Sequence, residues 1–177
     1  RSRSRSGRYH LCDPYFRFYF YFLEPLLSDS PFDAERAIEA IRKNLRAFVG
    51  GTAFEDLARQ WVRVQGKAGE LPFTPEAVGS HWSSRVQADV VAINWQTHDI
   101  LLGECKWGAD RVDRQVVRDL VDGKTPLVLQ DLPDGGKGWK VHYALFARSG
   151  FTPAAKTEMQ QKAGLLVDLK TLDSVLG

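Results

Sequence analysis

Cysteine is scarce in this chain, which contains two, Cys12 and Cys105. Two cysteines cannot form a disulfide framework, and neither lies in a CxxC motif or in a Cys/His cluster with zinc-site spacing. The four histidines, at positions 10, 81, 98 and 142, share no ligand spacing either. A metal centre built from cysteine or histidine is therefore not expected, and a reducing compartment, the cytoplasm, is the predicted location.

Long apolar runs and a strong net charge are also missing. The run FRFYFYFLEPLL is interrupted by Arg17 and Glu24 and is shorter than the ~20 residues that a membrane-spanning helix needs. The formal net charge of +2 neither requires nor excludes nucleic acid as a partner. The sequence contains no Walker phosphate loop, no GxGxxG and no nucleophile elbow, so it offers none of the sites that these motifs build.

The composition itself is that of a folded protein. Hydrophobic residues make up 44% of the chain and charged residues 26%, which predicts one main domain with a hydrophobic core. The basic tract RSRSRSGR at 1–8 is typical of a solvated tail. Because the chain begins with Arg1, we expect it to be a fragment of a longer polypeptide.

Apolar periodicity predicts three amphipathic helices in the first third of the chain, at 13–28, 33–49 and about 52–65. Asp13-Pro14 supplies the cap and first turn of the first helix, and Pro25 and Ser28-Asp-Ser-Pro31 are expected to interrupt it. Gly50-Gly51 is expected to end the second helix.

The pattern changes after position 78 to short β-rich runs. It predicts three strands in a meander, then a helix, a loop-like segment, a strand, a helix, a strand and a short terminal helix. The ranges are 78–85, 87–94, 99–107, 111–123, 123–139, 141–151, 152–164, 165–169 and 172–177. This order indicates an α/β fold with an αβββαβ core and a mixed sheet, preceded by N-terminal helices.

The hairpin formed by QADVVAIN and LLGECKW concentrates charge where a strand core should be apolar. Period-2 alternation places Glu104 and Lys106 on one face and Cys105 on the other. If Asn94 pairs with Asp99 across a four-residue turn, Asp89 lies opposite Glu104, at about 5 Å between Cβ atoms. Two carboxylates at that distance repel each other unless a proton or a cation lies between them, and Mg²⁺ prefers such oxygen ligands.

The acid-x-Lys tripeptide alone is not diagnostic. It occurs three times, at 104–106, 122–124 and 168–170, and only Glu104 has an acid opposite it in the expected register. An edge hairpin with solvated charges is the structural alternative.

Two further groups of charged residues have both a structural and a functional interpretation. Glu55 completes a capping box with Thr52, and it also precedes the strands, as an additional carboxylate of the site would. A phosphate clamp could be formed by Arg111, Arg114 and Arg118, but four aspartates share their segment, so an ordinary solvated helix face is the alternative.

The charged hairpin suits phosphodiester hydrolysis. A divalent ion, Mg²⁺ or Mn²⁺, held by Asp89, Glu104 and the carbonyl of Cys105 would polarise the phosphoryl oxygen and acidify a water. Lys106 would hold that water and screen the developing negative charge. The flanking tryptophans Trp82, Trp95 and Trp107 could stack on bases or cover a small core.

This arrangement resembles the PD-(D/E)xK, or restriction-endonuclease-like, nuclease superfamily. In that superfamily the acid opens the second strand and E-x-K lies on the third, which corresponds to Asp89 and Glu104-Cys-Lys106 here, with Ala88 in place of the preceding proline. The resemblance implies catalytic roles for Asp89, Glu104 and Lys106, with Glu55 assisting from the first core helix. Gln115 resembles a position that some members use.

A narrower resemblance is to the C-terminal domain of archaeal-type ATPases of prokaryotes. It is carried by RYHLCDPYFRFYFYFLEP, TAFEDLARQW, VGSHWSSRVQADVVAIN and LLGECKW. It implies that 1–50 are a basic tail and linker helices at the end of an upstream winged-helix and ATPase region, and that 51–177 form the nuclease-like domain. The expected partners are then DNA and the ATPase domain of the same polypeptide.

The leading hypothesis from the sequence is thus metal-dependent hydrolysis of DNA. The first alternative is a catalytically weak or inactive nuclease-fold module that binds nucleic acid or regulates the ATPase. The second is an interaction module in which the charged hairpin is structural.

Overall fold

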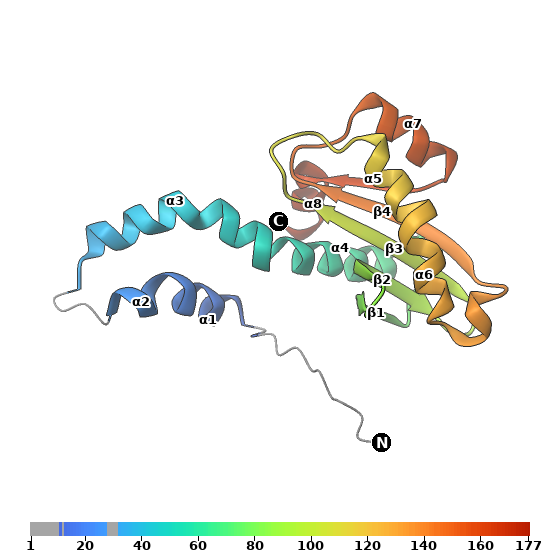
Figure 1. Cartoon of the computed structure of the whole chain (residues 1–177), viewed down its shortest axis with the longest axis horizontal. Helices are drawn as coiled ribbons and strands as arrows, with labels where there is room; N and C mark the ends of the chain where they lie inside the picture. Colours follow the sequence, from blue (N-terminus) through green and yellow to red (C-terminus); the bar gives the residue numbers. More distant parts are fainter. Residues whose placement is uncertain (1–10, 12, 28–31) are drawn as a thin grey trace, which may run out of the picture. The chain divides into compact units, whose positions relative to one another are not determined.

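The computed structural model describes residues 11, 13–27 and 32–177, which form two compact units (Figure 1). The first unit ends at Ala53 and the second comprises Phe54–Gly177. No helix in these described ranges is long and apolar enough to cross a membrane. The assignment of the first unit to an upstream ATPase region stays a prediction.

The first unit is helical throughout its ordered elements. The helix α1 (Pro14–Phe18) continues through a π-helical turn, η1 (Tyr19–Leu23), into α2 (Glu24–Leu27), and α3 spans Ala34–Thr52. Asp13 caps α1 as predicted, because its carboxylate accepts hydrogen bonds from the N–H groups of Tyr15 and Phe16. The aromatic side chains of α1 and η1 pack on one another and on α3: the ring centroids of Phe18 and Phe22 lie 4.9 Å apart, and those of Phe22 and Phe48 lie 5.2 Å apart.

Two helix ends predicted for this region are wrong. Pro25 does not interrupt the helix, because the wider π-helical turn directly before it accommodates a residue without an N–H donor. The rest of that predicted break, Ser28-Asp-Ser-Pro31, lies outside the described residues. Gly50-Gly51 does not end α3, which runs to Thr52, since glycine in a helix costs only about 1 kcal/mol.

The second unit is built on one five-stranded mixed sheet in the order β1-β2-β3-β4-β5. The strands are β1 (Ala77–Trp82), β2 (Gln87–Asn94), β3 (Asp99–Lys106), β4 (Lys140–Ala147) and β5 (Leu165–Asp168). The pairs β1–β2 and β2–β3 are antiparallel, whereas β3–β4 and β4–β5 are parallel. The predicted α/β class, with its αβββαβ core, is thereby confirmed.

Helices cover both faces of this sheet. On one face, the core that includes Leu101 is covered by α4 (Phe54–Ala68) and α8 (Leu169–Leu176). On the other face, the core that includes Ile100 and Leu102 is covered by α5 (Arg114–Arg118), the π-helical turn η2 (Asp119–Lys124), α6 (Thr125–Gln130) and α7 (Pro153–Gln161). Successive residues of β3 thus point to opposite faces, and residues 99–104 are buried, which explains the apolar run at 100–102.

The predicted helix end at 123 and the predicted loop at 123–139 are wrong in part. The chain stays helical from Arg114 to Gln130, and a 3₁₀ turn, η3, follows at Pro133–Gly136. Val128 of α6 is 2% exposed, so its burial stabilises a helical segment that local glycine and proline signals oppose. The Thr152 cap of α7, by contrast, is confirmed by its hydrogen bond from the Ala155 N–H.

Gly103 of β3 allows the close packing of the central strands to be tested. A Cβ atom there would lie 2.9 Å from the Cβ of Val90 and 3.2 Å from the ring of Phe146. We expect Gly103→Ala to destabilise the chain by about 1–3 kcal/mol, because both neighbours are buried and cannot move away freely. Urea unfolding measures the change. Gly79→Ala is the control, since a Cβ at that β1 position meets nothing within 4 Å; equal stability of the two variants would contradict the close packing around Gly103.

Candidate functional site

The predicted hairpin register is confirmed through most of its length. Asn94 pairs with Asp99, and the ladder between β2 and β3 continues to the pair Val90 and Gly103. Asp89 and Glu104 occupy the next position along the two strands, beyond the last ladder pair. In place of a ladder bond, the N–H of Cys105 donates to Oδ2 of Asp89 at 2.9 Å.

A β-bulge lies at Asp89 on the other edge of β2. Gly79 of β1 pairs with Val91 and His81 pairs with Ala88, so Asp89 and Val90 together lie opposite Ser80. Such an extra residue bends the strand and re-aims its side chains, and bulges are over-represented beside functional sites. No local sequence pattern predicts this bulge.

Glu104 is a buried carboxylate held between two lysines. Glu104 is 6% exposed. Its Oε1 accepts a hydrogen bond from Nζ of Lys106 at 2.8 Å, and its Oε2 accepts one from Nζ of Lys124 at 2.5 Å. The lysine side chains are 43% and 30% exposed, so solvent reaches the site from their side. The sequence pattern does not indicate Lys124, because it predicts a helix that ends at 123 and no acid opposite the tripeptide at 122–124.

The electrostatics of the acid pair are unfavourable for charge on Asp89. Burial, and then the charge of Glu104, raise the pKa of Asp89, while the hydrogen bond from the Cys105 N–H acts in the opposite direction. Burial by itself lowers the pKa of Lys106, but the hydrogen bond and charge of Glu104 outweigh it, so the net shift is upward. Lys106 is therefore held as a cation, which suits an electrostatic role and not that of a base.

Cys105 contributes its backbone and not its thiol. Burial and the charges of Asp89 and Glu55 raise the pKa of the thiol, which belongs to the core on the α4 side of the sheet. Because the N–H and C=O of one strand residue point to the same side, the carbonyl of Cys105 points toward β2, as its N–H does. This is the direction required of the carbonyl ligand that the sequence predicts.

The beginning of α4 is tied to Asp89 by a residue that sequence reasoning missed. Arg59 donates to the carbonyl of Asp89 at 2.7 Å, and it also binds the carboxylates of Asp56 at 2.6 Å and Glu55 at 3.4 Å. Glu55 thus lies close enough to act electrostatically on Asp89, but its described partner is Arg59. The predicted helix start is two residues too early, since α4 begins at Phe54, and the Thr52 side chain of the expected capping box lies outside the described residues.

The predicted arginine group does not join these residues. Arg111 and Arg114 are exposed, and Nε of Arg118 donates to Glu158 of α7 at 2.7 Å. The side chain of Gln115 likewise binds a helix neighbour, Asp119, at 2.8 Å. The helical segment after β3 therefore reaches the acid pair through Lys124 and not through its arginines.

The three tryptophans differ in their surroundings. Trp107 packs on Phe54, with ring centroids 4.9 Å apart, and the guanidinium of Arg148 lies 5.3 Å from its ring. Trp82 and Trp95 are about half exposed, at 50% and 48%. Trp107 therefore covers the core, whereas the other two present ring surface to solvent.

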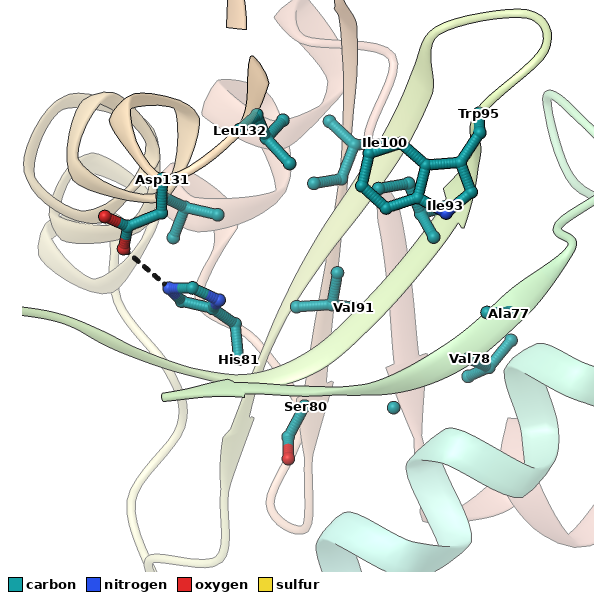
Figure 2. Close-up of a pocket in the computed structure, with 12 residues that line it drawn as sticks. Ala77, Val78, Ser80, His81, Val91, Ile93, Trp95, Ile100, Asp131 and Leu132 are labelled. Atoms are coloured by element: carbon teal, nitrogen blue, oxygen red, sulfur yellow. Dashed lines mark hydrogen bonds and ion pairs between the residues drawn. The ribbon is translucent and has the colours of Figure 1, made fainter. Parts of the chain in front are cut away.

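A pocket of about 390 Å³ lies along β1 and β2, on the sheet face covered by α6 (Figure 2). Val91 and Ile93 form its floor, Trp95 forms one wall, and His81 closes the other end with a 3.0 Å contact to Asp131. His81 and His142 thus both pair with aspartates, the latter with Asp99 at 2.8 Å. Neither histidine has a described contact with Asp89 or Glu104.

The donor set at the acid pair fits a hard divalent cation. Among the residues that the structure describes, no three His, Cys, Asp or Glu side chains gather as a metal centre. Two carboxylates and one carbonyl nevertheless meet the usual needs of Mg²⁺, which binds proteins through one or two carboxylates and keeps several waters. The residues that could hold it are Asp89, Glu104 and, through its carbonyl, Cys105.

The second unit is thus an α/β domain with a buried carboxylate pair at the end of a central hairpin. A family model described as archaea bacterial proteins of unknown function, DUF234, matches residues 19–117. The chain belongs to that family.

One relative is the uncharacterized protein MJECL04 of Methanocaldococcus jannaschii, which is 31% identical over 123 residues. The match covers 67% of this chain and 27% of that protein, so the chain spans about a quarter of its relative's length. No solved structure matches the chain.

The destabilising effect of a charged Asp89 carboxylate can be tested by measuring the free energy of unfolding at several pH values. A carboxyl whose pKa is higher in the folded than in the unfolded chain favours folding at low pH, and this contribution is lost as the pH rises through the folded-state value. We therefore expect Asp89→Asn, which does not ionise, to gain free energy of unfolding relative to the parent chain as the pH rises above about 4, the ordinary pKa of an aspartate. Urea unfolding with a chelator present measures this difference.

Asp110→Asn, at an exposed loop position after β3, is the control and should show no such trend. An Asp89→Asn variant that loses stability relative to the parent as the pH rises would show that the charged carboxylate stabilises the fold.

Proposed function

We propose that Phe54–Gly177 is a divalent-metal-dependent nuclease domain that hydrolyses phosphodiester bonds of DNA. One observation carries this proposal: Glu104 and Asp89 are buried carboxylates that lie together at the end of a hairpin, and Glu104 is bonded to Lys106. Burying two acids beside each other costs stability, and sites that keep such an arrangement are often functional.

Each residue of the site has its own role in this function. Asp89, Glu104 and the Cys105 carbonyl would hold the cation, and Arg59 fixes the backbone of Asp89 from α4. A bound Mg²⁺ or Mn²⁺ polarises the phosphoryl oxygen and acidifies a water. The Lys106 ammonium orients this water and screens the negative charge that develops on the phosphate.

The reaction is a simple displacement. A bond forms between the water oxygen and phosphorus, and the ester P–O bond breaks. The water gives up a proton to solvent, and the leaving oxygen takes up one. Glu55 is near enough to assist by its charge, and Arg111 and Arg114 are exposed and available to bind the DNA backbone.

The wider setting belongs to the same proposal. The domain acts in the cytoplasm as part of a polypeptide that also carries an ATPase. The much greater length of the Methanocaldococcus jannaschii relative supports the expectation of further domains.

The alternative is a nuclease-fold module that binds nucleic acid or regulates the ATPase without cleaving. It is favoured by the fact that both Glu104 oxygens already accept lysine hydrogen bonds and that no third acidic, cysteine or histidine side chain among the described residues completes a metal centre.

Calorimetric titration with Mg²⁺ and Mn²⁺, followed by cleavage assays on single-stranded, duplex and branched DNA, distinguishes these functions. We expect Glu104→Gln and Asp89→Asn to abolish saturable metal binding and cleavage, because each removes a charged ligand. Lys106→Ala should keep metal binding and lose cleavage by about 100-fold or more.

Glu70→Gln is the matched control, since Glu70 is exposed and follows the opposite end of α4 from Glu55. A parent chain without saturable metal binding would refute the nuclease function. Metal and DNA binding without cleavage would support the alternative, and intact cleavage by Lys106→Ala would refute the role given to that lysine.

A further inference from the structure

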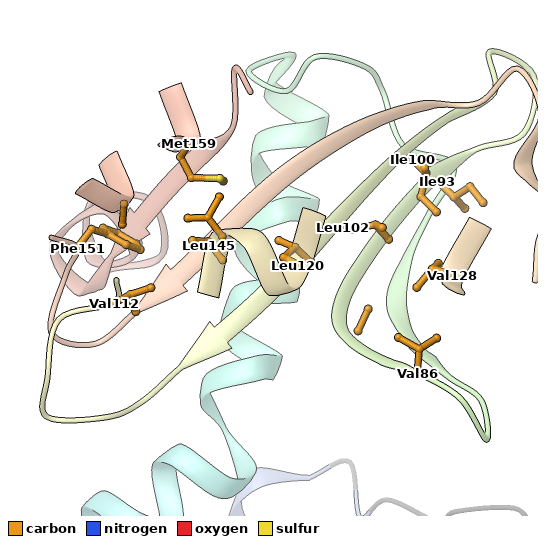
Figure 3. Packing of buried hydrophobic residues seen from close by; sticks show 14 residues of the cluster. Val86, Ile93, Ile100, Leu102, Val112, Leu120, Val128, Leu145, Phe151 and Met159 are labelled. Carbon is orange, nitrogen blue, oxygen red and sulfur yellow. The ribbon is translucent and has the colours of Figure 1, made fainter. Parts of the chain in front are cut away.

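Lys124 is held in place by a π-helical turn. In η2 the N–H of Thr125 bonds to the carbonyl of Leu120, and the Thr125 hydroxyl donates to the same carbonyl at 2.7 Å. Leu120 and Val128 on either side are 1% and 2% exposed and belong to one core (Figure 3). Segments of π-helix inside α-helices frequently occur at functional sites, and this one fixes the backbone from which Lys124 reaches Glu104.

Each oxygen of Glu104 is bound by a different lysine. Lys106 binds one of its oxygens and Lys124 binds the other, from the strand and from the helix respectively. Lys106 alone balances the charge of Glu104 at 2.8 Å, and the charge of Lys124 acts on Asp89 as well. Both lysines remain partly exposed, whereas the carboxylate between them is buried.

Two ammonium groups that converge on two oxygens of one anion are suited to a phosphate group. A phosphate, like a carboxylate, presents oxygens a short distance apart, and lysine binds it as a point charge. Lys106 and Lys124 approach from the exposed side, where a ligand would enter. The two ammonium groups around Glu104 therefore supply the positive charge that a phosphate group needs.

We propose that Lys124 is a phosphate-binding residue that pairs with Glu104 until a divalent cation binds there. Without a cation, Lys124 pairs with Glu104. When a divalent cation takes this carboxylate, the ammonium of Lys124 turns to an oxygen of the phosphate. This inference rests on the proposed function for the cation at Asp89 and Glu104, but it does not require cleavage.

The inference predicts two effects of opposite sign. Lys124 competes with the cation for Glu104, so its removal should tighten metal binding. Lys124 also binds the phosphate, so its removal should weaken binding of DNA. A lysine that only supports the fold would change both affinities in the same direction or change neither.

The experiment compares Lys124→Ala and Lys124→Arg with the parent chain. Mn²⁺ titration calorimetry without DNA measures metal affinity, and fluorescence anisotropy of a labelled oligonucleotide in Ca²⁺ measures DNA affinity. We expect Lys124→Ala to bind Mn²⁺ about 3- to 10-fold more tightly and the oligonucleotide about 5- to 10-fold more weakly. Lys124→Arg keeps the charge, so it should stay within about 2-fold of the parent for the oligonucleotide.

Lys162→Ala, at an exposed lysine after α7, is the matched control and should change neither affinity. Thermal melting of each variant checks that the fold is intact. Unchanged or weaker Mn²⁺ binding by a folded Lys124→Ala variant would refute the inference and leave the nuclease function standing. A parent chain that binds no Mn²⁺ would instead refute the proposed function, and this inference with it.

Discussion

The pairing of β3 on both edges is the constraint on which the rest of the second unit depends. Antiparallel bonds to β2 and parallel bonds to β4 leave this strand no free edge along most of its length. Its side chains are buried on both faces, so the register cannot slip without exposing the apolar run. The same register carries Glu104 and Lys106 to the end of the ladder, where the backbone of Cys105 is free to bind Asp89.

The charges at that end form one connected set. Arg59 joins α4 to the backbone of Asp89, the Cys105 N–H joins β3 to the Asp89 carboxylate, and Lys124 joins η2 to Glu104. Elements from both faces of the sheet therefore meet at the acid pair. This convergence offsets part of the cost of burying two carboxylates, and it leaves one side of the set open where the lysines are exposed.

Local patterns were sufficient for most of the fold. The period-2 runs predicted the three-strand meander and its Asn94–Asp99 register, and cap chemistry at Asp13 and Thr152 predicted two helix starts. The errors fall at Pro25, at Gly50-Gly51 and after Asp122, where residues that disfavour helix stand inside one. After Asp122 the burial of Val128 outweighs local propensity, and no local window contains that information.

The sequence by itself determined which residues could bear the chemistry on the hairpin, because strand alternation and turn length fix Asp89, Glu104 and Lys106 relative to one another. Only the tertiary structure decided what surrounds them. Lys124 lies 20 residues from Glu104 in the chain, and Arg59 lies 30 from Asp89. Contacts across such separations depend on how helices pack on the sheet, which side-chain periodicity does not encode.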